Sequence, residues 1–313
     1  METYKVERYH QENRAEWNTF VMKCMQQHFF FTRDFIEYHK DRFIDYSLII
    51  RNQTNQIVAL FPATLNEGVV SSHAGLTFGG LLYKPRTFVQ KIIDILSEIE
   101  RYCLVHDVQK IIYKVTPYIY KTEQGEEDVY ALFKNSWQLI RRDLSGVIKI
   151  DRQIAADRSR RKNERIALSN DIEIKACDDF EAFWTMLNEN LTNRHNVTPT
   201  HSLEELIYLK SLFPDQIKLI GGFKGGKMMS GTLLFLTPNV CKVQYSVNSI
   251  EGRKYKVLDA VFMQMIRDCE KEYIDFGHSC EEDGKYLNEG LARFKYQFSG
   301  ESLVNDFYLK ELK

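Results

Sequence analysis

The expected helices and strands follow the same order twice along the chain. Apolar residues spaced three and four apart predict helices, and short β-branched or aromatic runs predict strands. In the first half, helices are followed by strands, then a long helix, a strand, a helix and a closing strand. The helices expected there span 17–27, 34–42, 86–106 and 126–135, and the strands span 46–51, 56–65, 68–72, 81–83, 110–115 and 139–150, the last with a turn at Ser145 and Gly146.

The second half repeats this order after a polar stretch at 151–165 (DRQIAADRSRRKNER). A tight hairpin is expected at Gly225 and Gly226, because both positions of such a turn need positive φ. The expected strands span 172–176, 218–223, 228–236, 240–247, 273–276 and 303–309, and the helices span 180–191, 203–213, 257–271 and 286–298. The repetition predicts a duplicated α/β unit, with domains at 1–150 and 151–313.

The composition is that of an ordinary globular protein. Of its 313 residues, 44 % are hydrophobic and 27 % are charged, and the formal net charge is -1. With a net charge this close to zero, the protein has no overall positive potential that would attract DNA or an anionic membrane. The amino terminus is polar, the apolar runs are too short to span a bilayer, and the six cysteines form no C-x-x-C pair. We therefore expect a soluble cytoplasmic protein with no metal site.

The most distinctive motif is DFGHSCEEDGKYLNEGLARFKYQF at Asp275–Phe298, which predicts a strand, a glycine turn and a helix. Taken alone, these residues have a purely structural explanation, in which Gly277 supplies positive φ and Ser279 caps the next segment. A second cluster, SHAGLTFGG at 72–80, carries a glycine pair that suits a tight bend.

The order of elements resembles the acetyltransferase (GNAT) fold, and its tandem repetition resembles the FemAB/FemX type of peptidyltransferase. The resemblance is carried by DFGHS, Glu281, Gly284 and LNEGLARFKYQF within the first motif, and by the basic run SRRKNER at 159–165. The segment SHAGLTFGG resembles one in acetyltransferase-like proteins of bacterial surface-polysaccharide loci. The resemblance implies an α/β (α+β) fold of two tandem GNAT-like domains, each a mixed, mostly antiparallel sheet flanked by helices.

In the GNAT fold the acyl donor lies where the fourth and fifth strands splay apart, and here those strands are expected at 240–247 and 273–276. The resemblance places donor contacts at Gln244, Val247, Gly252, Arg253, Lys254, Lys256, Asn288 and Lys295. Acyl-CoA-dependent members usually carry Q/R-x-x-G-x-G/A before the long helix, and its backbone amides hold the pyrophosphate. Here that position reads SIEGRKYKVLD (249–259), with a single glycine, so basic side chains would have to replace part of this cradle.

Direct acyl transfer needs a base for the acceptor, and a proton donor serves the leaving thiolate. His278 and Glu281 are the candidate bases and Tyr245 is the candidate proton donor, although a strand tyrosine is more often a packing residue. The candidate acceptor contacts are His73, Gly79, Gly80, Arg194, His195 and Ser279. Structural alternatives also stay open for three residues. Asn288 could be a helix cap, Lys295 a solvated lysine and His201 an exposed loop residue.

The leading hypothesis is an acyltransferase that uses acetyl-CoA or another acyl-CoA to acylate an amino sugar, a nucleotide sugar or another small amine, possible precursors of the cell envelope, at nitrogen or oxygen. A FemX-like enzyme that uses aminoacyl-tRNA is the second hypothesis. The lack of a heptad run between 172 and 218 argues against tRNA, because FemAB enzymes that use it often carry a coiled-coil arm. The third hypothesis is a non-catalytic GNAT-fold binding protein. The acceptor, the acyl length and the oligomeric state stay open.

Overall fold

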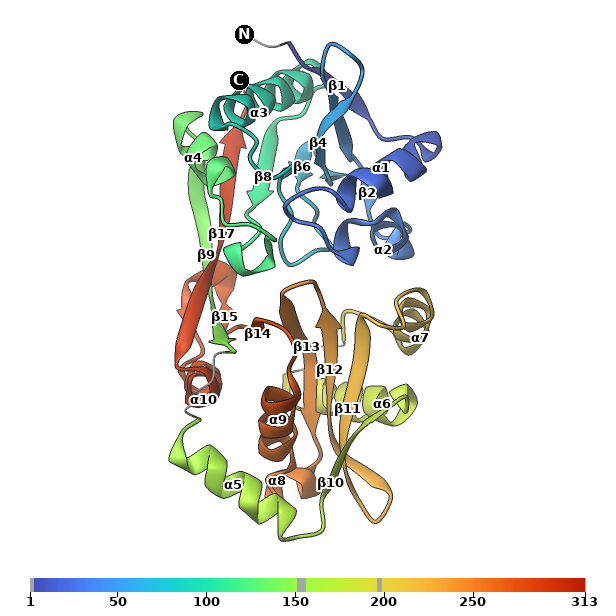
Figure 1. Ribbon diagram of the computed structural model, residues 1–313, viewed down its shortest axis with the longest axis vertical. Helices are drawn as coiled ribbons and strands as arrows, with labels where there is room; N and C mark the ends of the chain where they lie inside the picture. The colour runs from blue at the N-terminus through green and yellow to red at the C-terminus, as the bar shows by residue number, and fades with distance from the viewer. Residues whose placement is uncertain (1–2, 151–155, 196–198, 313) are drawn as a thin grey trace. The chain divides into compact units, whose positions relative to one another are not determined.

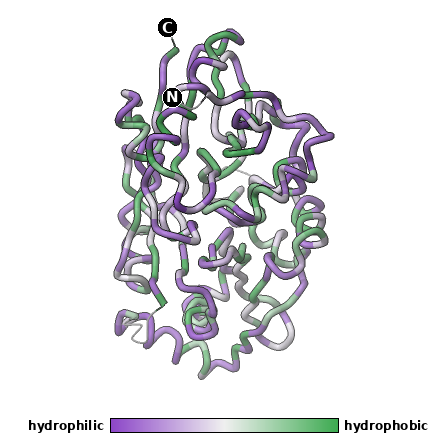
Figure 2. The backbone as a smooth tube through the Cα atoms, turned by 45° about the horizontal axis from the view of Figure 1, so that its top comes forward, coloured by the Kyte–Doolittle hydropathy of each residue, from purple (hydrophilic) through white to green (hydrophobic). Residues whose placement is uncertain are grey.

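The computed structural model of the chain describes residues 3–150, 156–195 and 199–312, with the backbone alone at 193–195 and 299. Its helices and strands are labelled in Figure 1. Hydrophilic and hydrophobic residues are interspersed along the trace (Figure 2). Among the described residues, no helix combines the length and the hydropathy that crossing a membrane requires.

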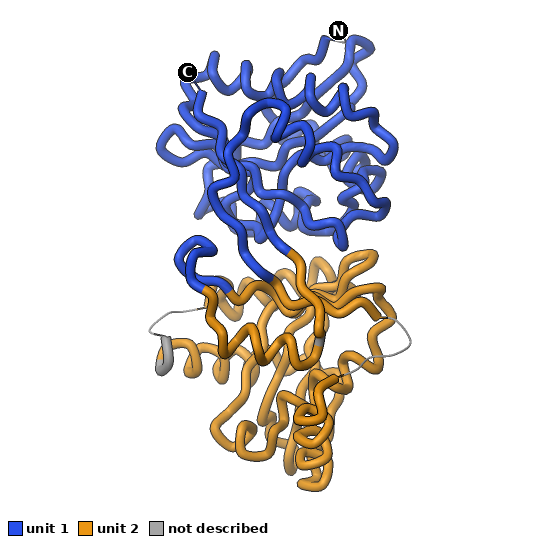
Figure 3. Tube along the Cα trace, turned by 90° about the vertical axis from the view of Figure 1, so that its left-hand side faces the viewer, with its two compact units in different colours: residues 1–144, 280–286, 304–313 blue, residues 145–279, 287–303 orange. Residues whose placement is uncertain are grey.

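The chain forms two compact units, which are coloured separately in Figure 3. Unit 1 comprises Met1–Leu144, Cys280–Tyr286 and Val304–Lys313, and unit 2 comprises Ser145–Ser279 and Leu287–Leu303. The strands β9 (Gln138–Lys149) and β17 (Glu301–Glu311) contribute residues to both units. The division into domains at residue 150 stays a prediction. The compact units follow a different boundary, because the end of β17 pairs with β8 (Lys110–Lys114) inside unit 1.

Unit 1 is built on two groups of strands, ordered β1-β3-β4-β7 and β9-β17-β8-β6-β5-β2. The long helix α3 (Val89–Val105) buries one apolar face in the core of this unit, with residues such as Ile92, Ile95 and Ile99. This face follows the three- and four-residue spacing from which the helix was predicted. The other strands are β1 (Lys5–Arg8), β2 (Ile44–Asp45), β3 (Leu48–Arg51), β4 (Ile57–Phe61), β5 (Thr64–Asn66), β6 (Val69–Ser71), β7 (Leu82–Tyr83) and β15 (Cys280–Glu281). The other helices are α1 (Arg14–Val21), α2 (Arg33–Ile36) and α4 (Glu127–Lys134), with 3-10 turns at Gln11–Asn13, Phe29–Phe31, Glu37–His39, Tyr118–Tyr120 and Glu282–Gly284.

Unit 2 is a single sheet with the strand order β10-β11-β12-β13-β14-β9. Its pairs are antiparallel except for β13 and β14, which run parallel. The strands are β10 (Glu173–Cys177), β11 (Ile217–Lys224), β12 (Lys227–Leu236), β13 (Val240–Asn248) and β14 (Tyr273–His278). The helices are α5 (Arg158–Leu168), α6 (Phe180–His195), α7 (Leu203–Leu212), α8 (Ile250–Lys254), α9 (Val257–Asp268) and α10 (Glu289–Ser299), and the short strand β16 (Tyr286–Leu287) joins the two units in sequence.

Helices cover both faces of the sheet in unit 2 (Figure 1). On one face, Phe262 and Met265 of α9 pack in a core with Leu234 and Val243 of the sheet. On the other face α6 approaches so closely that a Cβ on Gly231 would lie 2.6 Å from the ring of Phe183. The predicted architecture, mixed and mostly antiparallel sheets flanked by helices, is confirmed.

Several local predictions are confirmed or corrected. The hairpin at Gly225 and Gly226 is present, with φ of 55° and 81°. The turn expected at Ser145 and Gly146 is wrong, because β9 continues through both residues and Ser145 pairs with β14. The last helix begins at Glu289 rather than at 286, since the preceding residues extend into β16. The strand β1 was not expected.

Candidate functional site

The strands β13 and β14 pair at three positions only before they take different neighbours (Figure 1). The last of these pairs joins Lys242 and Asp275. Beyond it, β13 continues along β12 to Asn248, while β14 continues along β9 to His278. We call this place the divergence point. Beyond this point, backbone N–H and C=O groups that would otherwise pair β13 with β14 can form hydrogen bonds to a ligand. The divergence expected for these two strands is therefore present.

A β-bulge in β13 follows the divergence point directly. Leu233 of β12 pairs with Tyr245, whereas Leu234 pairs with Val243, so Gln244 is the extra residue in β13. Bulges of this kind bend a strand and change the direction of nearby side chains. The bulge therefore determines which face of the sheet Tyr245 points to. No sequence pattern predicted the bulge.

The side chain of Tyr245 meets His201, with 2.7 Å between the phenol oxygen and Nδ1. His201 is 5 % exposed, and its carbonyl accepts a hydrogen bond from Nε1 of Trp184 in α6. It also directly precedes Ser202, which forms a capping box with Glu205 at the start of α7. The helix cap and the tryptophan thus hold His201 in place. The expectation that His201 is an exposed loop residue is wrong, because its ring is buried against β13.

The acid–base character of this pair follows from its surroundings. Burial raises the pKa of Tyr245, and hydrogen bonds with Thr200 and Gln244 oppose the rise. A phenol with a raised pKa stays protonated at neutral pH, so it can donate its proton to a basic leaving group. The neighbouring imidazole can then exchange a proton with the phenol across their hydrogen bond.

A buried charged pair marks the divergence point itself. Lys242 is 6 % exposed and Asp275 is 4 % exposed. Burial lowers the pKa of Lys242, while the charge of Asp275 opposes this effect. The Asp275 carboxylate also accepts the backbone N–H of Gly277 at 2.7 Å, which accounts for the Asp-Phe-Gly turn.

Lys242 lies on the same face of the sheet as His201. It pairs with Phe235 of β12, and opposite residues of paired strands share a face. The Phe235 ring meets the His201 ring edge-on, with 6.3 Å between their centroids. Lys242 was not a candidate from the sequence, because a lone lysine in a strand gives no sign of burial. We call His201, Lys242, Tyr245 and Asp275 the divergence cluster.

The segment expected to hold the donor phosphates folds into α8 and the turn before α9. Four of its backbone amides, those of Gly252, Arg253, Tyr255 and Lys256, donate hydrogen bonds within the segment. Gly252 is required by packing, since a Cβ there would lie 2.3 Å from the carbonyl oxygen of Met229. These four amides are therefore already used within the segment.

The basic residues of this segment differ in their surroundings. The guanidinium of Arg253 donates to Asn190 of α6 at 2.9 Å and to the carbonyl of Asn248 at 3.1 Å, so it ties α6 to the end of β13. Lys254 is exposed and Lys256 is half-buried. The donor contacts predicted on β13 lie nearby in sequence, with Gln244 half-buried in the bulge and Val247 buried.

The predicted residues at the end of β14 are organised around α10. The Lys295 ammonium donates to the carbonyls of Gly277 at 2.8 Å and His278 at 2.6 Å, and the residue is 8 % exposed. The solvated-lysine alternative for Lys295 is therefore wrong. Asn288 caps α10, since its side chain accepts the N–H of Leu291. The donor contacts predicted at Asn288 and Lys295 stay predictions.

Three other candidates surround this turn. His278 is exposed at the end of β14, and Ser279 is 4 % exposed, with its carbonyl accepting the N–H of Asn288. Glu281 is exposed on β15 and belongs to unit 1, whereas His278 and Tyr245 belong to unit 2. The roles predicted for these residues stay predictions.

The glycine-rich segment of unit 1 has a clear structural explanation. The Lys114 ammonium donates to the carbonyls of His73, Ala74 and Leu76, which fixes the loop. Gly80 has φ of +80°, and a Cβ on Gly79 would lie 2.0 Å from the carbonyl oxygen of Ser72. Both glycines thus permit a close approach of the backbone to neighbouring groups.

His73 is 2 % exposed, and burial lowers its pKa to about 3. The substrate contacts predicted at His73, Gly79 and Gly80 stay predictions.

The last two candidates end α6, which runs to His195 rather than to 191. The side chains of Arg194 and His195 lie outside the described part of the structure. Among the side chains that are described, no three His, Cys, Asp or Glu residues are grouped so that they could hold a metal ion.

No protein-family model and no curated protein matches the sequence. Solved structures do match over nearly the whole chain. FemX has a TM-score of 0.68 at 10% identity, covering 98% of this chain and 97% of its own. The C-terminal domain of a protein described as a lysylphosphatidylglycerol synthetase from Agrobacterium fabrum has a TM-score of 0.62 at 9% identity, covering 95% and 91%. A tandem GNAT protein from the clavulanic acid biosynthesis pathway has a TM-score of 0.51 at 11% identity, covering 99% of both chains. At such identities the likeness concerns the fold, and the chain has a tandem GNAT-like fold of the FemAB/FemX type.

Proposed function

We propose that the protein is an acyltransferase whose reaction takes place at the divergence point of β13 and β14. The observation that carries the proposal is the divergence cluster, in which a hydrogen-bonded tyrosine and histidine lie beside strands that cease to pair. Backbone amides of β13 beyond Lys242 can donate to the acyl carbonyl, where negative charge develops during the transfer. Lys242 and Asp275 are both buried and face each other in the last pair before the strands separate.

The chemistry needs one proton acceptor and one proton donor. The acceptor's amine or hydroxyl attacks the acyl carbonyl, and collapse of the tetrahedral intermediate breaks the bond to the leaving group. Tyr245 protonates that leaving group, and His201 takes the proton lost by the acceptor and returns one to the phenol oxygen. The buried phenol suits this role because it is protonated before the leaving group departs. No covalent enzyme intermediate is involved.

The donor we propose is a thioester, with acetyl-CoA or a longer acyl-CoA as the candidates, and the acceptor is a small amine or a sugar. Lys254 and Lys256 would meet the donor phosphates in place of backbone amides, since charge can replace part of such a cradle. Binding that depends on surface lysines is sensitive to salt. We therefore expect acyl-CoA binding to weaken as ionic strength rises.

The role of Tyr245 beside His201 is tested by Tyr245→Phe. Turnover is measured with acyl-CoA and a panel of amino sugars and small amines. Loss of a general acid should lower kcat by about 100-fold with little change in donor binding. The matched control is Tyr296→Phe, because Tyr296 is 62 % exposed on α10. Glu281→Gln tests the base predicted at Glu281 against the one proposed here at His201. If it lowers kcat as much as His201→Gln does, then the base assigned here is wrong.

A second candidate is transfer from aminoacyl-tRNA, and one specific observation favours it. Four amides of 249–256 donate hydrogen bonds within the segment and are not available to a pyrophosphate, whereas a tRNA would be held by contacts over a larger surface. Acetyl-CoA and longer acyl-CoAs at millimolar concentration should raise the melting temperature if the thioester proposal is right. No shift with any acyl-CoA, together with salt-sensitive binding of charged tRNA, would replace it with the second candidate.

A further inference from the structure

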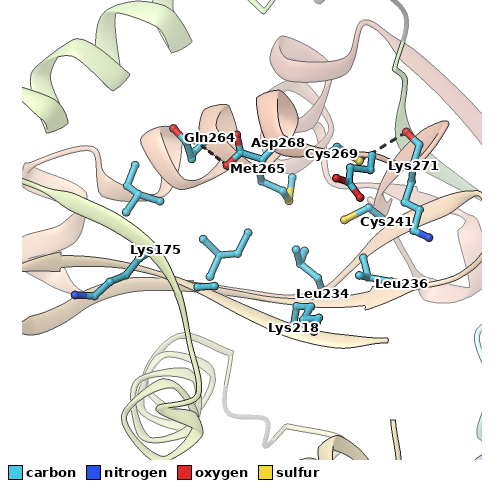
Figure 4. Close-up of a pocket in the computed structure, with 14 residues that line it drawn as sticks. Lys175, Lys218, Leu234, Leu236, Cys241, Gln264, Met265, Asp268, Cys269 and Lys271 are labelled. Atoms are coloured by element: carbon cyan, nitrogen blue, oxygen red, sulfur yellow. Dashed lines mark hydrogen bonds between the residues drawn. The ribbon is translucent and has the colours of Figure 1, made fainter. Parts of the chain in front are cut away.

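Unit 2 contains a pocket that is separate from the divergence cluster. It has a volume of about 340 Å³ and lies between the sheet and the carboxyl end of α9. Ile220, Leu234 and Met265 form part of its apolar wall, while Lys271 lies at its edge. The proposed acyl transfer uses none of these residues. Figure 4 shows the lining side chains, including two cysteines from different elements.

The two cysteines of this wall are Cys241 of β13 and Cys269, which follows the last residue of α9. Both side chains border the same pocket. The Sγ of Cys269 also lies 3.8 Å from the carbonyl oxygen of Lys271. Cys241 is 3 % exposed, whereas Cys269 is half-buried and borders the pocket. Cys269 is thus the more accessible of the two thiols.

We propose that this pocket is a thiol–disulfide exchange site, in which Cys269 attacks a small anionic disulfide and Cys241 completes the reaction. The pocket admits a small molecule, and its three lysines (Lys175, Lys218 and Lys271) outnumber its two carboxylates (Asp268 and Glu270), which favours a negatively charged one. Because both thiols border one pocket, Cys241 is placed to meet the Cys269 sulfur in the second step. This proposal is independent of the acyl transfer and concerns the opposite face of the sheet, because Cys241 and Lys242 are neighbours in β13.

The reaction balances as two exchanges. The Cys269 thiolate attacks one sulfur of the small disulfide, whose S–S bond breaks, and the departing thiolate takes the proton of the Cys241 thiol. The Cys241 thiolate then attacks the Cys269 sulfur and expels the second small thiolate, which takes a proton from solvent. Two protein thiols are oxidised to one disulfide, and the small disulfide is reduced to two thiols.

The surroundings support this division of roles. The hydrogen bond from Cys241 lowers the pKa of Cys269 to about 7, although burial opposes it, and the charge of Lys271 contributes in the same direction. The thiolate is the attacking species, so Cys269 should react first. Cys177 provides the internal comparison, because it is also half-exposed but burial raises its pKa.

The experiment uses oxidised glutathione at pH 7 with the full-length protein, followed by peptide mapping under non-reducing conditions. The wild type should form the disulfide between Cys241 and Cys269. Cys241→Ala should stop at a mixed glutathione disulfide on Cys269, and Cys269→Ala should leave Cys241 unmodified. Cys177→Ser should behave as the wild type. A wild type that stops at the mixed disulfide, or that forms neither product, would overturn the proposal.

A second measurement covers the case in which Cys241→Ala does not fold. Alkylation of the wild type by iodoacetamide at pH 7 should be faster at Cys269 than at Cys177 by on the order of tenfold or more, because a larger fraction of Cys269 is thiolate. Equal rates at the two residues would also overturn the proposal. Thermal unfolding of each variant shows whether it is folded before the exchange is interpreted.

Discussion

Three buried histidines should make unit 1 sensitive to mild acid. His28, His39 and His73 are 3 %, 4 % and 2 % exposed. Among the described residues, Nε2 of His28 and both ring nitrogens of His39 have no hydrogen-bond partner. Nδ1 of His73 accepts the N–H of Gly75, which it can do only in the neutral form. The fold therefore holds all three rings in their neutral form.

The size of the effect follows from the pKa values. Burial lowers the pKa of His28 to about 3, of His39 to about 4 and of His73 to about 3, from 6.5 in the unfolded chain. A group whose pKa is lowered by folding binds protons in the unfolded state first, so stability is full above pH 6.5 and falls as the pH decreases. Between pH 7.5 and pH 5.5 each ring should cost roughly 1.4 kcal/mol, or about 4 kcal/mol together. Carboxylates contribute little in this interval, because they titrate below it.

Urea unfolding at pH 7.5 and 5.5 measures this loss. In a Trp184→Phe background the remaining tryptophans, Trp17 and Trp137, both belong to unit 1 and report on it alone. His39→Gln should reduce the pH-dependent loss by about a third, whereas the exposed His106→Gln should leave it unchanged. A loss below about 1 kcal/mol in the parent protein would refute the reasoning, because it would require the rings to be protonated in the folded state.

Three other predictions concern contacts described above. Gly80→Ala should lower the free energy of unfolding by about 2 kcal/mol or more, because Gly80 has φ of +80° and lies against the buried ring of Tyr113. Gly225→Ala should lower it by about 1 kcal/mol, because Gly225 has φ of +55° but no neighbouring atoms within 4 Å of an added Cβ. Urea unfolding of the two variants compares these losses. Lys114→Met should speed hydrogen exchange of residues 73–76, which its ammonium holds, and unchanged exchange would contradict the role given to it. Asp259→Asn and Arg160→Met should each cost about 2 kcal/mol but combine less than additively, since the two side chains form a mostly buried ion pair at 2.7 Å.

Local sequence signals predicted much of the fold. Both hairpin glycines of unit 2 adopt positive φ, as the pair itself indicated. The long helix α3 was recognised because its apolar spacing is regular over several turns. The start of α10 was misplaced by a few residues, because the Asn288 cap lies inside a motif that was read as continuous helix.

The candidate site was less accessible to sequence reasoning, because it depends on pairing between distant segments. The divergence of the two strands was expected from the family resemblance, but the bulge at Gln244 depends on the register with β12. The capping box of Ser202 and Glu205 does not reveal that the preceding His201 is buried against β13. Lys242 became a candidate only when its burial opposite Asp275 was known.

The central claim is that acyl transfer takes place at the divergence cluster. The most direct test is single-turnover acyl transfer from acyl-CoA by the wild type, Tyr245→Phe and Tyr296→Phe, with donor binding measured separately for each. The account predicts that only Tyr245→Phe slows the chemical step, by about 100-fold, while all three bind the donor equally. Equal rates in the wild type and Tyr245→Phe would contradict it.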